Sequence, residues 1–258
     1  DDRDLTAEWR SAHPEGHYAE DAKSLAAADR TPLLALLADS HMAYASQRAL
    51  PDSTQPTLPA MTAKAIELLD RSNDGFFLVV EGGRIDHAHH AGNAFNALSD
   101  TIEFAEAVQT AVDRTDPGET LIVVTADHSH VFTIAGYPRR GNPILGTVVA
   151  PDAEGPTLDE NGLPYTTLGY ANGRGYRHYG DELDADRAYA DPPAPGRFDL
   201  SEIDTTAPGY HQEALVPLGA ETHGGEDVAV YATGPGARAV SGVQEQNLLF
   251  HVMLQATG

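Results

Sequence analysis

The sequence predicts an α/β fold built on a mostly parallel central sheet, and three observations lead to this class. Two apolar runs, "FFLVV" at 76–80 and "LIVV" at 121–124, are continuous rather than alternating, which is typical of strands buried on both faces. A long helical pattern separates them, and a strand–helix–strand order predicts a right-handed crossover between parallel strands. An irregular stretch at 136–218 then interrupts the pattern, so we expect a core that carries one insertion.

The individual elements follow from apolar spacing. Residues 1–75 are expected to be mainly helical and irregular. The long helix has Leu98, Ile102 and Val112 on one side, and we expect that side to pack on the sheet. The predicted elements of the core are, in order, a helix at about 57–71, a buried strand within 75–83, a helix at 91–113, strands at about 121–126 and 227–233, and a last helix at 243–256.

The insertion is predicted to be a folded subdomain rather than a linker. Seven of the ten tyrosines fall between Tyr137 and Tyr210, among many Gly, Pro and Asp residues. Flexible linkers are rich in small or polar residues and do not need aromatic side chains. We therefore divide the chain into a core made of residues 1–135 and 219–258 and an inserted subdomain at 136–218.

Charge and composition exclude several classes of partner. The formal net charge is −23, with 39 acidic and 16 basic residues. Nucleic acids and anionic membranes both need basic surfaces, so neither is expected as a partner. The acidic excess indicates either an ordinary soluble surface or, as we favour, adaptation to high salt, where screening reduces self-repulsion. The absence of cysteine excludes disulfides and thiolate metal sites, and no apolar stretch is long enough to span a membrane.

Metal-binding residue types gather in three loops at strand ends, where ligands collect in α/β sheets. Six of the twelve histidines lie in these loops. The candidate ligands are Glu81, Asp86 and His90 in the first loop, Asp127 and His128 in the second, and His223 in the third. Asp86 and His90 are four residues apart and would share a helix face. Carboxylates with imidazoles suit zinc, whereas an oxygen-only site suits magnesium.

We expect Asp86, His90 and His223 to hold one zinc, Asp127 and His128 a second, and Glu81 a magnesium. Two metals about 4 Å apart can act as a clamp for in-line displacement at phosphorus. Taken singly, these residues have ordinary explanations, such as a loop histidine, a capping aspartate or a buried ion pair. Their joint occurrence favours metal binding.

Other roles were weighed for the neighbouring residues. His87, His89 and His130 would support the ligands or face the substrate, although His89 could equally be a surface or core histidine. A hydrolase triad of Asp127, His128 and Ser129 is rejected, because adjacent residues at one strand end point in different directions.

Five motifs, taken together and in order, resemble alkaline phosphatases, most nearly the animal-type and related bacterial enzymes. They are "VEGGRIDHAHH", "VTADHSHVF", "GYPRRGNPILG", "ETHGGEDVAV" and "GVQEQNLLFHVM". The resemblance implies a three-layer sandwich with a crown-like insertion and two zinc ions and one magnesium per site. It further implies hydrolysis of phosphate monoesters through a phosphoserine, a homodimer, and a periplasmic or secreted location.

The resemblance also assigns roles to single residues. Carried over by position, it gives the first zinc Asp86, His90 and His223, the second zinc Asp127 and His128, and magnesium Glu81. His87 corresponds to a catalytic-site residue near the bound phosphate. His130 corresponds to a histidine that supports Asp86, and Tyr137 to a tyrosine that reaches the partner subunit's active site.

The nucleophile of the family is absent from this sequence. No Asp-Ser-Ala motif occurs, and the chain opens with "DDRDLTAEW", without an initiator methionine or a signal-peptide pattern. We expect the chain to be the C-terminal half of such an enzyme, to associate with a polypeptide that supplies the N-terminal half, and to be inactive alone. The alternatives are a related two-zinc phosphodiesterase or sulfatase, and a non-catalytic metal-binding fragment.

Overall fold

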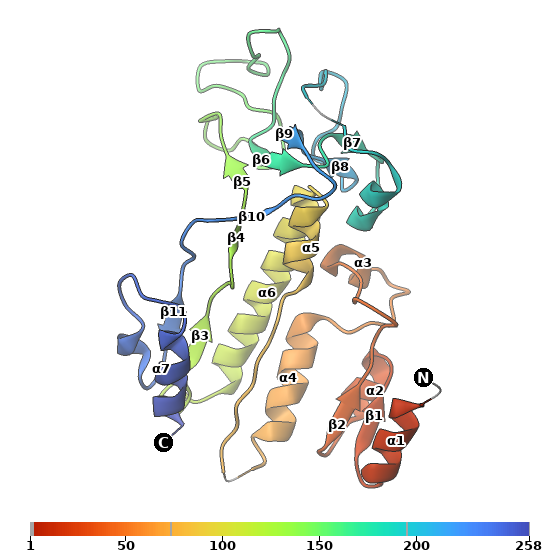
Figure 1. Cartoon of the computed structure of the whole chain (residues 1–258), viewed down its shortest axis with the longest axis vertical. Coiled ribbons are helices and arrows are strands. Elements are labelled where there is room, and N and C mark those ends of the chain that lie inside the picture. The colour runs from red at the N-terminus through yellow and green to blue at the C-terminus, as the bar shows by residue number, and fades with distance from the viewer. Residues whose placement is uncertain (1–2, 73, 195, 258) are drawn as a thin grey trace.

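Two long helices lie side by side at the centre of the molecule. The computed structural model describes residues 3–72, 74–194 and 196–257. Within them, α4 (Leu58–Leu69) packs along α6 (Ala94–Arg114), as Figure 1 shows. The helices predicted at 57–71 and 91–113 are thereby confirmed, with ends shifted by no more than a few residues.

Capping side chains explain where the two helices begin. The Thr57 side chain accepts a hydrogen bond from the amide of Ala60, and the Asn93 side chain accepts one from the amide of Asn96. An acceptor at this position satisfies an N–H group that the first turn of a helix leaves free. None of the helices in the described ranges is long and apolar enough to cross a bilayer.

The N-terminal region is mainly helical and irregular, as predicted, but it also contains two short strands that were not predicted. It contains α1 (Leu5–Ala12), β1 (His17–Ala19), α2 (Ala22–Ala27), β2 (Leu33–Ala35) and α3 (Ala45–Arg48). Strands β1 and β2 pair in parallel and lie with α1 and α2 at the lower right of Figure 1, whereas α3 contacts α6.

The prediction of a strand within 75–83 is wrong, because no strand is formed there among the described residues. Residues 76–82 pair with no described strand. Phe77 is 61% exposed and Val79 is 74% exposed. A strand forms only where a neighbour supplies partners for its N–H and C=O groups. The expected parallel pair around α6 is therefore not formed among these residues, and Ile102 on the apolar side of α6 is exposed.

The other core elements are formed but are shorter than predicted. Strand β3 (Ile122–Val124) pairs antiparallel with β11 (Tyr231–Thr233), so that Val123 faces Ala232. A short 3-10 helix, η2 (Ala237–Ala239), follows, and α7 (Leu248–Ala256) is the last helix. The expected starts at 227 and 243 were both four or five residues too early.

The predicted insertion lies at the far end of the molecule from the termini (Figure 1). Its elements are β6 (Leu168–Gly173), β7 (Arg177–His178), the 3-10 helix η1 (Ala185–Ala190), β8 (Tyr210–His211) and β9 (Ala214–Pro217). Strand β6 pairs in parallel with β9 and antiparallel with β5 (Phe132–Ile134), which precedes residue 136. The boundaries of the subdomain remain a prediction.

Three short elements bring the candidate ligands together between the core and this end. Helix α5 (Arg84–His90) packs on the start of α6. Strands β4 (Ser129–His130) and β10 (His223–Gly224) pair antiparallel, with His223 opposite His130. Residues that lie about 90 positions apart in the sequence are thus fixed opposite each other, facing α5.

Candidate metal centre

Helix α5 presents one carboxylate and one imidazole on the same face. Asp86 Oδ1 lies 3.3 Å from His90 Nε2, as the spacing of four residues predicts. On the opposite face, Ala88 is completely buried. Ala88 packs in a buried cluster with Tyr44, Ala91 and Ala97, so this face of the helix is turned toward the interior and the other toward the site.

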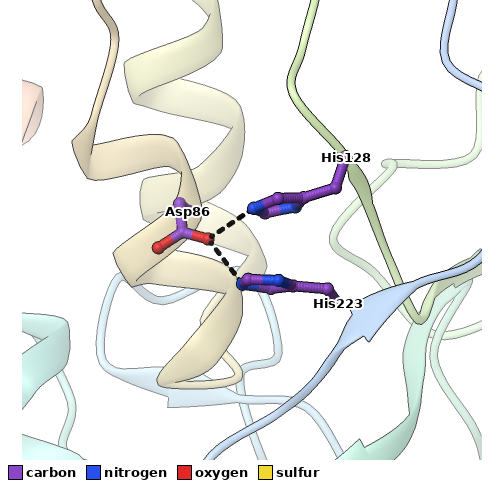
Figure 2. A group of neighbouring side chains, drawn as sticks. All are labelled: Asp86, His128 and His223. Carbon is purple, nitrogen blue, oxygen red and sulfur yellow. Dashed lines mark ion pairs between the residues drawn. The ribbon is translucent and has the colours of Figure 1, made fainter. Parts of the chain in front are cut away.

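The β4–β10 pair and the loop before it supply three more imidazoles. Nε2 of His130, His223 and His128 lies 3.1, 3.4 and 3.8 Å from Asp86 Oδ1. The His128 and His223 rings are stacked, with centroids 3.5 Å apart and planes 16° apart. Figure 2 shows these two rings reaching toward Asp86, His223 from strand β10 and His128 from the segment just before β4.

This arrangement fits a bound cation. Asp86 Oδ1 is buried and has no hydrogen-bond partner, although four imidazole Nε2 atoms surround it. A buried acceptor without a partner is costly unless something else compensates it. Convergent imidazole and carboxylate donors are the set that zinc prefers. The residues present therefore fit a zinc ion better than a network of hydrogen bonds.

Two groups of potential ligand atoms can be distinguished among the described residues. In one group the atoms of Asp86, His128 and His223 lie within 4.8 Å of one another. In the other, the atoms of His90, His130 and Glu221 do so. The three residues predicted for the first zinc are all close together, since His223 Nε2 is 3.2 Å from His90 Nε2. His128, predicted for the second zinc, lies among them.

Two predicted ligands lie outside both groups. The side chain of Asp127 is 82% exposed, and its Oδ2 lies 3.4 Å from His128 Nε2. Glu81 is exposed at the end of the extended segment 76–82. The division of the ligands into two zinc sites and a magnesium site thus remains a prediction.

His87 belongs to neither ligand group. Its Nδ1 lies 2.8 Å from Arg84 Nη1, and its ring packs edge-on against His41 with centroids 4.3 Å apart. Burial, followed by the charge of Arg84, lowers the pKa of His87. Arg84 in turn pairs with Asp186 of η1 at 2.9 Å, which ties the insertion to α5.

His89 supports the site from the buried side. Its ring stacks on that of His130, with centroids 4.5 Å apart, and its Nδ1 lies 2.9 Å from the Tyr170 hydroxyl. Burial lowers the pKa of His89 to about 3, so the ring is neutral at physiological pH. It therefore adds no positive charge beside the metal ligands.

Tyr137 lies away from these groups, at the start of the predicted insertion. Its side chain is 91% exposed, and its backbone has a φ of 46°, a left-handed conformation that is uncommon outside glycine. Its predicted contact with a partner subunit remains a prediction.

Sequence reasoning missed Glu221. Its side chain is completely buried, and its Oε2 lies 2.7 Å from His130 Nδ1. The signal was present, because Glu221 stands two residues before His223 in the motif "ETHGGEDV". A carboxylate so close to a predicted ligand is a candidate to bind either the metal or another ligand.

Comparison with known proteins gives a single family. The family model described as alkaline phosphatase matches residues 1–258. The chain is 42% identical over 262 residues to the tissue-nonspecific alkaline phosphatase of Gallus gallus, covering 99% of the chain and 46% of that protein. It is 40% identical over 265 residues to alkaline phosphatase 4 of Drosophila melanogaster, covering 99% and 43%. The chain spans about half the length of the curated relatives it matches.

Solved structures give the same fold. A cold-active alkaline phosphatase from Shewanella sp. superposes with a TM-score of 0.62 at 20% identity, covering 99% of this chain and 63% of that one. The Thermus thermophilus alkaline phosphatase gives 0.63 at 23% identity, covering 98% and 58%. A TAB5 alkaline phosphatase mutant with Mg bound in its M3 site gives 0.58 at 24%, covering 99% and 55%. The α/β fold of this type predicted from the sequence is thereby confirmed.

Proposed function

The chain belongs to the alkaline phosphatase family, and on that premise we propose that it supplies the metal-binding part of an enzyme that hydrolyses phosphate monoesters. One observation carries the proposal beyond family membership. Four imidazole Nε2 atoms converge on Asp86 Oδ1, a buried oxygen that has no hydrogen-bond partner.

The proposed cofactors are two zinc ions and one magnesium per active site. Asp86, His90 and His223 would hold the first zinc, Asp127 and His128 the second, and Glu81 the magnesium. When bound, such ions would neutralise charge on the transferring phosphoryl group and lower the pKa of a water or hydroxyl. Asp127 and Glu81 are exposed in this chain and are the weakest members of the set.

The protein's own residues would organise this centre. The stacked rings of His128 and His223 hold each other in one orientation, so they need no reordering when a cation binds. His130 would orient Asp86 from 3.1 Å, and His87 would lie near the bound phosphate, supported by Arg84. Such pre-organised donors stabilise charge as it develops in a transition state.

The nucleophile is proposed to be a serine outside this chain, phosphorylated during the reaction. The chain contains no Asp-Ser-Ala motif and covers under half of the Gallus gallus relative. Residues that supply this nucleophile, in the same polypeptide or in another, are proposed to complete the site, and residues 1–258 alone are expected to be inactive.

Assembly and surroundings are further proposals from the family. We propose a homodimer, with the exposed Tyr137 reaching toward the partner, and a periplasmic or secreted location. The net charge of −23 supports adaptation to high salt. That idea predicts an unfolding midpoint that rises between 0.1 and 2 M NaCl, and a flat or falling midpoint would count against it.

The test of the proposed function combines metal content with substrate choice. Metal analysis of the purified chain after incubation with zinc and magnesium should find zinc bound, and His223→Ala should lower its content, whereas His251→Ala on the exposed side of α7 should not. The protein completed by its nucleophile-bearing part should hydrolyse p-nitrophenyl phosphate well above bis(p-nitrophenyl) phosphate. The reverse preference would favour a phosphodiesterase, and zinc binding without hydrolysis by that protein would favour a non-catalytic metal-binding module.

A further inference from the structure

Glu221 is a buried carboxylate for which the proposed ligand set has no role. Its side chain is completely buried, and both oxygens are engaged. Oε1 accepts a hydrogen bond from the amide of Val131 at 2.8 Å, and Oε2 lies 2.7 Å from His130 Nδ1. A buried carboxylate is tolerated when its oxygens are paired in this way.

The main chain of Glu221 contacts a second imidazole. Its carbonyl oxygen lies 2.6 Å from His90 Nδ1, and its amide donates to the carbonyl oxygen of His90 at 3.0 Å. One residue therefore faces the Nδ1 atoms of two imidazoles, one through its side chain and the other through its backbone.

The backbone of Glu221 is held by close packing against strand β6. Gly173 has a φ of 136°, and a Cβ there would lie 3.1 Å from Glu221 Cβ and 3.3 Å from Glu221 Cα. Only glycine allows the strand to approach so closely. The contact with β6 gives Glu221 a rigid support, which a residue that orients others needs.

We propose that Glu221 is a positioning residue of the metal centre. In both His90 and His130, Nδ1 faces a hydrogen-bond acceptor and must therefore carry the ring proton. This contact keeps the Nε2 atoms turned toward Asp86 Oδ1, at 3.3 and 3.1 Å. An acceptor behind a ligand imidazole fixes its tautomer and orientation. Direct ligation by Glu221 is the poorer explanation, because both of its oxygens already accept hydrogen bonds. The inference rests on the proposed function, since it concerns the ligands of that centre.

The experiment compares wild-type chain with Glu221→Gln. Nitrogen-15 spectra of labelled histidines should show a proton on Nδ1 of both His90 and His130 in the wild type. An amide cannot accept from both Val131 and His130, so Glu221→Gln should free His130 Nδ1. The proton on His90 Nδ1 should stay, because that atom lies 2.6 Å from the backbone carbonyl oxygen of Glu221 and only 3.5 Å from its Oε2. Zinc affinity, measured by competition with a chromophoric chelator, should fall about 10- to 100-fold.

A matched control removes the same charge nearby. Glu226 bonds to the Ser129 hydroxyl at 2.9 Å, and Glu226→Gln should leave both the spectra and zinc affinity as in the wild type. The inference is overturned if Glu221→Gln binds zinc like the wild type or leaves the His130 signals unmoved. Should that variant fail to fold, the wild-type spectra decide, because an unprotonated His130 Nδ1 also overturns it. If the wild-type chain binds no zinc, the proposed metal centre itself fails, which is a separate result.

Discussion

Asp86 is the residue on which the candidate metal centre depends. It stands on α5 and has its buried Oδ1 within 3.8 Å of four imidazole nitrogens from three separate segments. Among the described residues, no other carboxylate lies this close to so many imidazole nitrogens. An ionised carboxylate oxygen only accepts hydrogen bonds, so it is suited to binding a cation together with the imidazoles around it.

We predict that Asp86→Asn lowers zinc affinity by at least about 100-fold. The substitution keeps the shape of the side chain but removes the charge of a proposed ligand, and changes even to residues that only hydrogen-bond to a ligand cost about 10- to 100-fold. Isothermal titration with zinc measures the loss. Asp52→Asn, at an exposed position, is the control, and an affinity within a factor of three of wild type in Asp86→Asn would exclude Asp86 as a ligand.

Asp100 is a second buried carboxylate, and it lies on the packed side of α6. Both of its oxygens accept from the amide of Ala45, and it lies 3.7 Å from Arg48, which also pairs with Glu103. Burial raises the pKa of Asp100 from 3.8 to about 6, despite the opposing effect of the Ala45 amide and of Arg48. The folded protein therefore binds this proton more tightly than the unfolded chain does.

The consequence is a loss of stability as pH rises. The contribution of Asp100 is fully present below about pH 4 and is lost as the pH rises through about 6, and the shift corresponds to roughly 3 kcal/mol of unfolding free energy. Asp100→Asn should remove this dependence. Urea unfolding of both proteins between pH 4 and 7 tests it, with the exposed Asp113→Asn on the same helix as control. Parallel curves for wild type and Asp100→Asn would contradict the prediction.

At the scale of elements, the β4–β10 pair assembles the site. Gly224 stands opposite Ser129, and a Cβ at Gly224 would lie 3.0 Å from the carbonyl oxygen of His130 and closer still to the Ser129 hydroxyl. His223 and His130 keep their positions only while these two strands stay in contact. A methyl group at Gly224 would force the Ser129 and Glu226 side chains to move and would press on the carbonyl oxygen of His130.

Gly224→Ala should therefore weaken zinc binding by about 10-fold or more and lower the unfolding midpoint. The adjacent Gly225 is a matched control, because a Cβ there meets nothing within 4 Å. Calorimetric unfolding and zinc titration of both variants make the comparison. Equal behaviour of Gly224→Ala and Gly225→Ala would show that the pairing does not hold the ligands.

The sequence predicts those elements that depend on local signals. Apolar spacing and the caps Thr57 and Asn93 define α4 and α6, and both are found. The strand at 76–80 fails because strand formation depends on a partner elsewhere, which no local pattern reveals. The partner of β3 was likewise beyond prediction, since β11 lies more than 100 residues further along.

The candidate site follows the same division. The ligand types and the face shared by Asp86 and His90 could be predicted from spacing alone. The motif "ETHGGEDV" places Glu221 two residues from a candidate ligand, but its contact with His130 depends on burial and distance, which residue type does not reveal. For Asp127 and Glu81 the sequence names the residues, but both are exposed and neither belongs to a ligand group among the described residues.

At the scale of the whole molecule, the proposed ligands come from three segments that a metal would join. Asp86 and His90 lie on α5, His128 lies immediately before β4, and His223 lies on β10. A ligand that binds only the folded chain stabilises it by mass action, by about 2.7 kcal/mol at a hundred times its dissociation constant.

Zinc at that concentration should therefore raise the unfolding midpoint by about 5–10 °C, given a shift of about 2–4 °C per kcal/mol for a chain of this size. A chelator should reverse the shift, and Asp86→Asn should not show it. Differential scanning calorimetry provides the measurement. An unfolding midpoint that does not change with zinc would mean that zinc does not join these three segments.

The most direct test of the metal centre is diffraction from crystals of the chain grown with zinc, collected on both sides of the zinc absorption edge. We predict an anomalous peak about 2.0–2.2 Å from a carboxylate oxygen of Asp86 and from Nε2 of His223, with His90 or His128 completing the set. A fully occupied zinc peak bound elsewhere, or no peak among these side chains, would contradict the central claim.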